Sequence, residues 1–319
     1  MTERNSNFDW LRLFLAASVA YFHAGYFSSL ANGGGAPFTL ILFPMVPTFL
    51  ALSGFLMFRS FATSAHYGHF AWKRALRILP GLLLALALSG LVWGFDRGFV
   101  GSALTYLGGG IFFGSTGNGS LWSLLWEEIA YGLMAVLLSL GAYNRRWLIW
   151  CLLTASCAIA AWWNQVEPVW RITNLAPALF TGNLVFLYRD RISRLPWQAI
   201  LASIVVITAV NKGFDFQPQA WYMVPVGCGL ALMLCLSAPQ LPRLRADVSY
   251  GLYVFHDPIY SAASRIWPHS FADMFFPGTV ALIVISLISW YLVEKPALAF
   301  KGVFPRRVPM ARPQSSRAL

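Results

Sequence analysis

Residues 8–27 read FDWLRLFLAASVAYFHAGYF. As one helix, this apolar run can cross the hydrocarbon core of a membrane, which takes about 20 residues. It carries Asp9 and Arg12 near its start and His23 inside, and no convincing small-residue cleavage site follows it. We therefore expect a retained transmembrane helix rather than a signal peptide.

The composition extends this expectation to the whole chain. Of its 319 residues 58% are hydrophobic and only 11% are charged, whereas soluble domains carry about 25% charged residues. No hydrophilic segment is long enough to fold alone, so residues 1–304 are expected to form a single membrane domain. Residues 305–319 form a basic, proline-rich tail that we expect to be disordered at the cytoplasmic face, near anionic lipid.

Polar breaks divide the domain into about ten apolar spans, which predicts an all-α polytopic membrane protein. The connection 96–121 holds an apolar patch too short to cross, so we expect it to lie at the interface or to fold back into the protein. The shorter spans need burial in the bundle or a locally thinned bilayer. The expected spans are 8–28, 37–58, 75–95, 122–142, 147–163, 173–188, 196–211, 218–238, 248–264 and 275–293.

The net charge of +11 could suggest a nucleic-acid partner, but the distribution of the basic residues predicts membrane orientation instead. Of the 23 Lys and Arg residues, only Arg97, Arg171, Lys212 and Arg265 fall on one side of the spans. The positive-inside rule then places both termini in the cytoplasm, in agreement with an even number of spans. We expect membrane lipid and no nucleic acid as a partner.

Ionisable residues inside spans are costly and are therefore functional candidates. Arg12 and His23 are eleven residues apart, which returns them to nearly one helix face with a rise of roughly 16 Å. Glu127 and Glu128 lie at a depth similar to that of His23. The alternative is structural: a snorkelling Arg12, a His23 that hydrogen-bonds between helices, and carboxylates at the interface.

Two further groups are candidates. His256, Asp257 and Pro258 break the ninth span, where a proline frees a backbone carbonyl and allows a kink that lines a cavity. A structural kink with a packed histidine is the alternative. Arg74 and Arg77 are i,i+3 neighbours at the start of the third span and can hold phosphate groups or serve as membrane anchors.

A metal site is not expected. His66 and His69 form an H-x-x-H pattern, but no further ligand types follow at a suitable spacing.

Six segments in order resemble acyltransferase family 3, the bacterial integral-membrane O-acyltransferases. Arg12 to His23 is similar to an R-x10-H signature, and the chain as given resembles the stand-alone type without an SGNH domain. The other segments are FLALSGF (49–55), KRALRILP (73–80), LWSLLWEEIAY (121–131), SYGLYVFHDP (249–258) and EKP (294–296). Lys73 stands where the family often has Arg.

The resemblance implies transfer of an acyl group, usually acetyl, from cytoplasmic acyl-CoA to a hydroxyl group. The acceptor it implies is a cell-surface or exported glycan, such as exopolysaccharide, lipopolysaccharide or a lipid-linked precursor, and the location is the bacterial inner membrane. Arg12, Arg74 and Arg77 would form a basic inner mouth for the CoA phosphates, with Ser53 near the donor.

The chemistry needs a base and an oxyanion donor. His23 suits the general base, or alternatively a transient acyl carrier. Glu127 would orient its imidazole, and His256 would position the substrate or donate to the oxyanion.

Two other classes stay open on sequence alone. A transporter or flippase also places polar residues in the membrane, although no repeat between the two halves is evident. A non-catalytic scaffold would not need Arg12, His23 and Glu127 to face one cavity. The sequence does not identify the glycan, the hydroxyl, the size of the acyl group or the oligomeric state.

Overall fold

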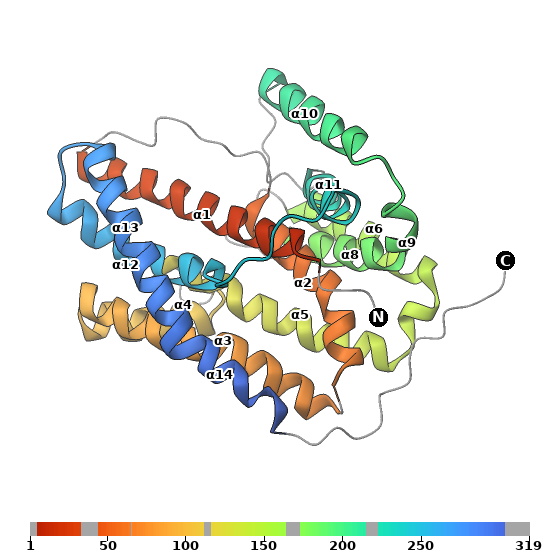
Figure 1. Cartoon of the computed structure of the whole chain (residues 1–319), viewed down its shortest axis with the longest axis horizontal. Helices are drawn as coiled ribbons and strands as arrows, with labels where there is room; N and C mark the ends of the chain where they lie inside the picture. The colour runs from red at the N-terminus through yellow and green to blue at the C-terminus, as the bar shows by residue number, and fades with distance from the viewer. Residues whose placement is uncertain are drawn as a thin grey trace.

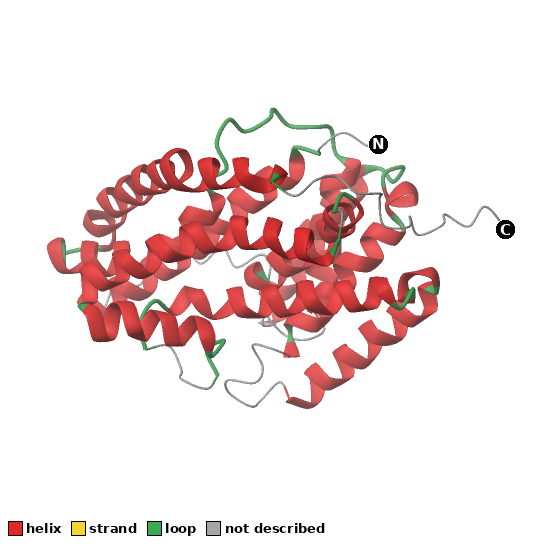
Figure 2. Ribbon diagram, turned by 90° about the horizontal axis from the view of Figure 1, so that it is seen from below, coloured by secondary structure: helices red, strands yellow, loops and turns green. Residues whose placement is uncertain are grey.

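The computed structural model describes residues 5–32, 44–64, 66–111, 116–163, 173–214 and 223–303. Within these ranges the chain is helical and has no strand (Figure 2). The tail 305–319 and the beginning of the expected span 37–58 lie outside the described residues. The longer helices are α1 (Asn7–Asn32), α2 (Met45–Ala62), α3 (Tyr67–Trp93), α5 (Trp122–Ser139), α6 (Arg146–Trp163), α8 (Leu175–Leu187), α10 (Trp197–Phe214), α11 (Met223–Ser237), α12 (Ser249–Ile266) and α13 (Phe271–Ser289).

Each expected span overlaps one of these helices. By length and composition, six stretches of the described chain can cross a membrane: Asn7–Ala31, Met45–Ala62, Tyr67–Trp93, Gly119–Ser139, Arg146–Trp163 and Phe271–Gly302. Helices α8, α10 and α11 are apolar but shorter, and α12 carries polar residues along its length. The protein is thus an all-helical protein with several candidate spans, while the count of ten and the orientation of the termini remain predictions.

The outer surface of the helix bundle is rich in apolar side chains. Large apolar side chains are exposed on its outer helices, for example Leu91 at 83% and Trp162 at 84%. Such surface is unfavourable in water but matches hydrocarbon. The short helix α8 is buried along most of its length, as expected for a span too short to face lipid alone. Helix α10, by contrast, stands at the periphery and packs on α11 (Figure 1).

Two groups of helix contacts, one around α12 and one between α2 and α8, organise the interior. Helix α1 packs along α12, which in turn packs on α13, and α2 packs along α8 (Figure 1). The second contact depends on glycines: a Cβ at Gly182 would lie 1.9 Å from the carbonyl oxygen of Ala51, and one at Gly54 would lie 2.8 Å from that of Leu179. Glycine lets the two backbones approach this closely.

In its described parts, residues 96–111 and 116–121, the connection after α3 folds back into the protein, which was one of the two expected outcomes; residues 112–115 lie outside the described residues. A short π-helix, η1 (Phe95–Val100), returns along α3 and continues into α4 (Gly101–Leu107). The 3₁₀ turn η2 (Gly119–Leu121) then leads directly into α5 and contacts α12. Asn118 and Ser120 are buried by this return.

The remaining short elements connect or end the long helices. They are η3 (Ala142–Asn144), α9 (Arg189–Ile192), η4 (Trp290–Glu294), α14 (Lys295–Ala299) and η5 (Phe300–Gly302).

Candidate active site

The packing of α1 on α12 brings His23 to Asp257. His23 Nδ1 lies 2.7 Å from Asp257 Oδ1. Because a carboxylate accepts hydrogen bonds, Nδ1 carries the hydrogen and Nε2 carries the lone pair. The His23 side chain is 30% exposed, whereas that of Asp257 is 5% exposed. The pair therefore presents an oriented imidazole whose unprotonated nitrogen can accept a proton.

The connection between α3 and α5 holds the other oxygen of Asp257. The backbone N–H of Ser120 donates to Asp257 Oδ2 over 2.9 Å. Asn118 Nδ2 donates to the carbonyl oxygen of Val254 over 2.8 Å. That carbonyl has lost its usual helical partner because Pro258, four residues later, has no N–H. The Val254 carbonyl that the proline leaves unpaired is thus hydrogen-bonded by Asn118. Asn118 belongs to the same segment as Ser120, which holds Asp257.

His256 lies behind the pair and is fully buried. Its Nδ1 donates to the carbonyl oxygen of Leu252 over 3.2 Å, and its ring meets that of His23 edge-on at 4.5 Å. Nε2 lies 3.2 Å from Asp257 Oδ1. The expected role, to position the substrate or to donate to the oxyanion, is not supported by this placement, because the ring is fully buried. Its contacts instead support the positions of His23 and Asp257.

His23, His256 and Asp257 could each offer one ligand atom to a metal ion, since these atoms lie within 4.8 Å of one another. Two ligands at about 2.0–2.1 Å from a tetrahedral zinc would be roughly 3.3 Å apart. His23 Nδ1 and Asp257 Oδ1 are only 2.7 Å apart. The contacts as they stand are those of a hydrogen-bonded pair.

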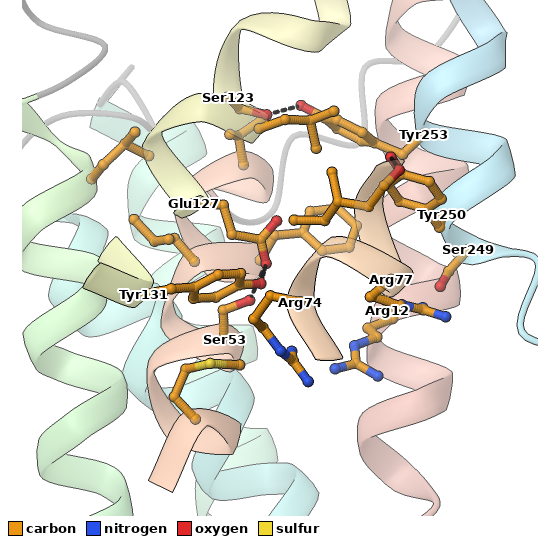
Figure 3. A pocket seen from close by; sticks show the side chains of 17 residues that line it. Arg12, Ser53, Arg74, Arg77, Ser123, Glu127, Tyr131, Ser249, Tyr250 and Tyr253 are labelled. Carbon is orange, nitrogen blue, oxygen red and sulfur yellow. Dashed lines mark hydrogen bonds between the residues drawn. The ribbon is translucent and has the colours of Figure 1, made fainter. Parts of the chain in front are cut away.

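A cavity that is partly open to solvent lies beside this cluster. The side chains of Arg12, Arg74 and Arg77 gather at one end, and Ser123 and Tyr253 face each other at the opposite end (Figure 3). The cavity and the histidine cluster are neighbours, because the ring of Tyr253 lies 6.0 Å from that of His256, one turn along α12. All three arginines predicted to form a basic mouth therefore line one cavity.

The three arginines differ in their partners. Arg77 pairs with Asp247 at 2.8 Å, and Arg12 lies 3.8 Å from Asp9. Burial alone would raise the pKa of Asp247, but the positive charges of Arg77 and Arg12 and the hydroxyl of Ser249 hold it well below its usual range.

Arg74 contacts no carboxylate within the described part of the chain. One of its terminal nitrogens donates to Ser60 Oγ over 3.2 Å, and its guanidinium lies 5.5 Å from the centre of the Tyr131 ring. Its Nε is buried without a partner. Among the three arginines of the cavity, Arg74 is therefore the one with no carboxylate partner in the described part of the chain.

Glu127 lines the cavity but does not partner His23, so the expected pairing of these two residues is wrong. Glu127 Oε1 accepts a hydrogen bond from Ser53 Oγ over 2.5 Å and another from the hydroxyl of Tyr131. Glu127 and His23 were matched by depth alone, and depth does not determine which neighbouring helix a side chain meets. Helix α2 brings Ser53 to Glu127, while α12 brings Asp257 to His23.

Several residues of the site were not predicted as such. Asp257 stood beside a candidate histidine without a role of its own. Asn118 and Ser120 lie in the connection whose structure the sequence did not indicate. Tyr253 lies in the segment SYGLYVFHDP (249–258), and Ser123 lies in the segment LWSLLWEEIAY (121–131). Nothing in the sequence indicated that these two side chains meet.

The sequence profile of acyltransferase family 3, described as an acyltransferase domain, matches residues 5–295. Nodulation protein 10 of Rhizobium leguminosarum bv. viciae is 27% identical, over 96% of this chain and 97% of the relative. An O-acetyl transferase of Shigella phage Sf6 is 22% identical, over 77% of this chain and 82% of the relative. No solved structure matches the chain.

The match spans nearly all of the membrane domain and includes every element that builds the cavity and the histidine cluster. It decides between the enzyme and the two other classes left open by the sequence. The chain belongs to acyltransferase family 3 and is a membrane O-acyltransferase.

Proposed function

We propose that the enzyme transfers an acetyl group from cytoplasmic acetyl-CoA to a hydroxyl of a cell-surface or exported glycan, within the bacterial inner membrane. The observation that carries this proposal is the His23–Asp257 pair, in which the His23 side chain is partly exposed and its Nε2 has no partner among the described residues, beside a cavity with a basic end. The relative named an O-acetyl transferase supports acetyl as the group transferred.

The basic end of the cavity suits the phosphates of a CoA. Arginine binds phosphate through charge-assisted hydrogen bonds, and Arg74 is the residue with charge and a buried N–H to offer. The rise from Arg12 to His23 along α1 is roughly 16 Å, about the length of a pantetheine arm. A donor held at the arginines would thus present its thioester at the far end of the cavity.

In the proposed reaction the acceptor hydroxyl gives its proton to His23 Nε2 as its oxygen attacks the thioester carbonyl. The carbon–oxygen bond forms, the carbon–sulfur bond breaks, and the proton leaves with the thiolate as free CoA thiol. Asp257 holds the tautomer and stabilises the imidazolium that forms, which is the role of the third group in a triad. Ser53, Glu127 and Tyr131 shape the cavity wall between the two ends.

The experiment that tests this function measures acetyl-CoA binding and CoA release by the purified full-length protein in nanodiscs. We expect Arg74→Ala to weaken binding and His23→Ala to bind normally but release no CoA. Arg194→Ala, which removes an exposed arginine away from the cavity, is the matched charge control and should behave as wild type. Failure of the wild-type protein to bind acetyl-CoA at millimolar concentration would contradict the donor assignment.

A further inference from the structure

The end of the cavity opposite the arginines is formed by two hydroxyls. Ser123 Oγ and the Tyr253 hydroxyl lie 2.7 Å apart, and either can be the donor. Both residues line the cavity, Ser123 from α5 and Tyr253 from α12 (Figure 3). Tyr253 is otherwise buried, with its ring against Phe49 at 5.5 Å.

One O–H of this pair is not used in the hydrogen bond between the two hydroxyls. Two hydroxyls have two hydrogens, and the bond between them uses one. Neither hydroxyl has a further hydrogen-bond partner among the described residues. Whichever group donates, one O–H hydrogen is left, and it belongs to an atom that faces the cavity.

One helix terminus contributes partial positive charge at this point. Ser123 is the second residue of α5, so the partial positive charge of that helix N-terminus lies beside it. The carboxylates nearest to the site are already engaged, Asp257 by His23 and Ser120, and Glu127 by Ser53 and Tyr131.

We propose that the Ser123–Tyr253 hydroxyl pair is the oxyanion-stabilising donor of this enzyme. When the thioester reaches this end of the cavity, the remaining O–H donates a hydrogen bond to the carbonyl oxygen of the thioester. This hydrogen bond becomes stronger as negative charge develops on that oxygen. The pair takes the role that the sequence assigned to His256. This inference rests on the proposed function, since it presumes an acyl-CoA in the cavity.

The test compares Tyr253→Phe and Ser123→Ala with a control on the same helix. Tyr260 also hydrogen-bonds a hydroxyl of a neighbouring helix, Thr279 Oγ1 at 2.9 Å, and it does not line the cavity. Tyr260→Phe therefore removes the same kind of bond from α12 without touching the site. The probe is acetyl-CoA, and the reaction followed is its hydrolysis to free CoA by the full chain in nanodiscs.

We expect Tyr253→Phe to lower kcat by about 10²-fold with little change in KM, because loss of one oxyanion donor typically costs roughly 10²–10³-fold. Ser123→Ala should lower kcat less, because it keeps the phenolic O–H, which is more acidic than a serine hydroxyl and therefore the stronger donor, whereas Tyr253→Phe keeps only the weaker serine O–H. The control Tyr260→Phe should keep kcat within about threefold of wild type. Equal losses in Tyr253→Phe and Tyr260→Phe, or a loss confined to KM, would overturn the proposal.

A second readout separates donation from packing. The infrared carbonyl band of bound, carbon-13-labelled acetyl-CoA should lie at lower frequency in wild type than in Tyr253→Phe, because a hydrogen bond weakens the carbonyl. An identical band in both proteins would contradict the inference while leaving acyl transfer intact. Absence of any bound acetyl-CoA in wild type would instead contradict the proposed function itself.

Discussion

Asp257 connects the two parts of the site through its two carboxylate oxygens. One of its oxygens orients His23 and the other is held by the backbone of Ser120. Such a carboxylate has to remain an acceptor to keep the correct histidine tautomer. Replacing it with an amide retains the size of the side chain but removes the charge that stabilises an imidazolium.

We therefore predict that Asp257→Asn lowers kcat by roughly 10²–10⁴-fold, since general-base catalysis is worth about this much. The KM for acetyl-CoA should change little, because Asp257 does not line the donor cavity. Steady-state CoA release at varied acetyl-CoA separates the two constants. A variant with wild-type kcat would show that His23 works without this partner.

Asp247 gives a pH-dependent prediction outside the membrane spans. Its pKa is lowered by Arg77 and Arg12 despite its burial, so the charge pair stabilises the fold at neutral pH. Asp247→Asn should reduce the free energy of unfolding by about 1–3 kcal/mol at pH 7.

The sign of the pH effect follows from the direction of that shift. Stability from a depressed carboxyl pKa is fully present above the unfolded value, about 3.9, and is lost as pH falls through the lower folded value. The difference in Tm between wild type and Asp247→Asn should therefore be the same at pH 8 and at about pH 5. A difference that disappears between those two pH values would show that Asp247 is not held ionised.

At the scale of elements, α12 and the connection between α3 and α5 act as one unit. Pro258 removes the N–H that would bond to the carbonyl of Val254, and Asn118 replaces it. Asn118→Ala should thus destabilise the protein by about 1–3 kcal/mol, because a buried carbonyl loses its side-chain partner.

A double-mutant cycle tests this coupling. In Pro258→Ala an N–H returns to α12, so adding Asn118→Ala to that variant should cost much less than it does in wild type. Thermal unfolding of the four proteins measures the coupling. Additive losses would show that Asn118 acts elsewhere.

The close crossing of α2 and α8 gives the second element-scale prediction. Gly182→Ala places a Cβ against the backbone of Ala51, so the helices have to separate, at a cost of about 1–3 kcal/mol or more. Gly132→Ala on α5 meets nothing within 4 Å and is the matched control. The yield of folded protein and its Tm in detergent should fall for the first variant and hold for the second.

The helices were largely predictable from the sequence, because apolar length is a local signal. The expected span 122–142 became Trp122–Ser139, and 248–264 became Ser249–Ile266. The path of residues 96–121 was not predictable, since η1 and α4 are fixed by packing on α3 rather than by periodicity. The partner of His23 was missed for the same reason: depth can be counted along a helix, but neighbours depend on how helices are arranged around each other.

At the scale of the whole molecule, the bundle places a basic cavity and an oriented histidine on adjacent sides of α12. The arginines mark one end of the cavity and the Ser123–Tyr253 pair marks the other, next to His256 (Figure 3). This arrangement allows a donor to enter from the basic end while the acceptor approaches the exposed face of His23. Transfer then requires that both substrates meet at the end of the cavity near α12.

The most direct test of this arrangement is acetyl transfer to a glycan by cells that produce the enzyme. Mass spectrometry of the surface glycan should find the mass of an added acetyl group with the wild-type protein and with Arg194→Ala. The same glycan should lack that acetyl group with His23→Ala, when the three proteins are present in the membrane in equal amounts. An acetylated glycan in cells that make only His23→Ala would contradict the central role of His23.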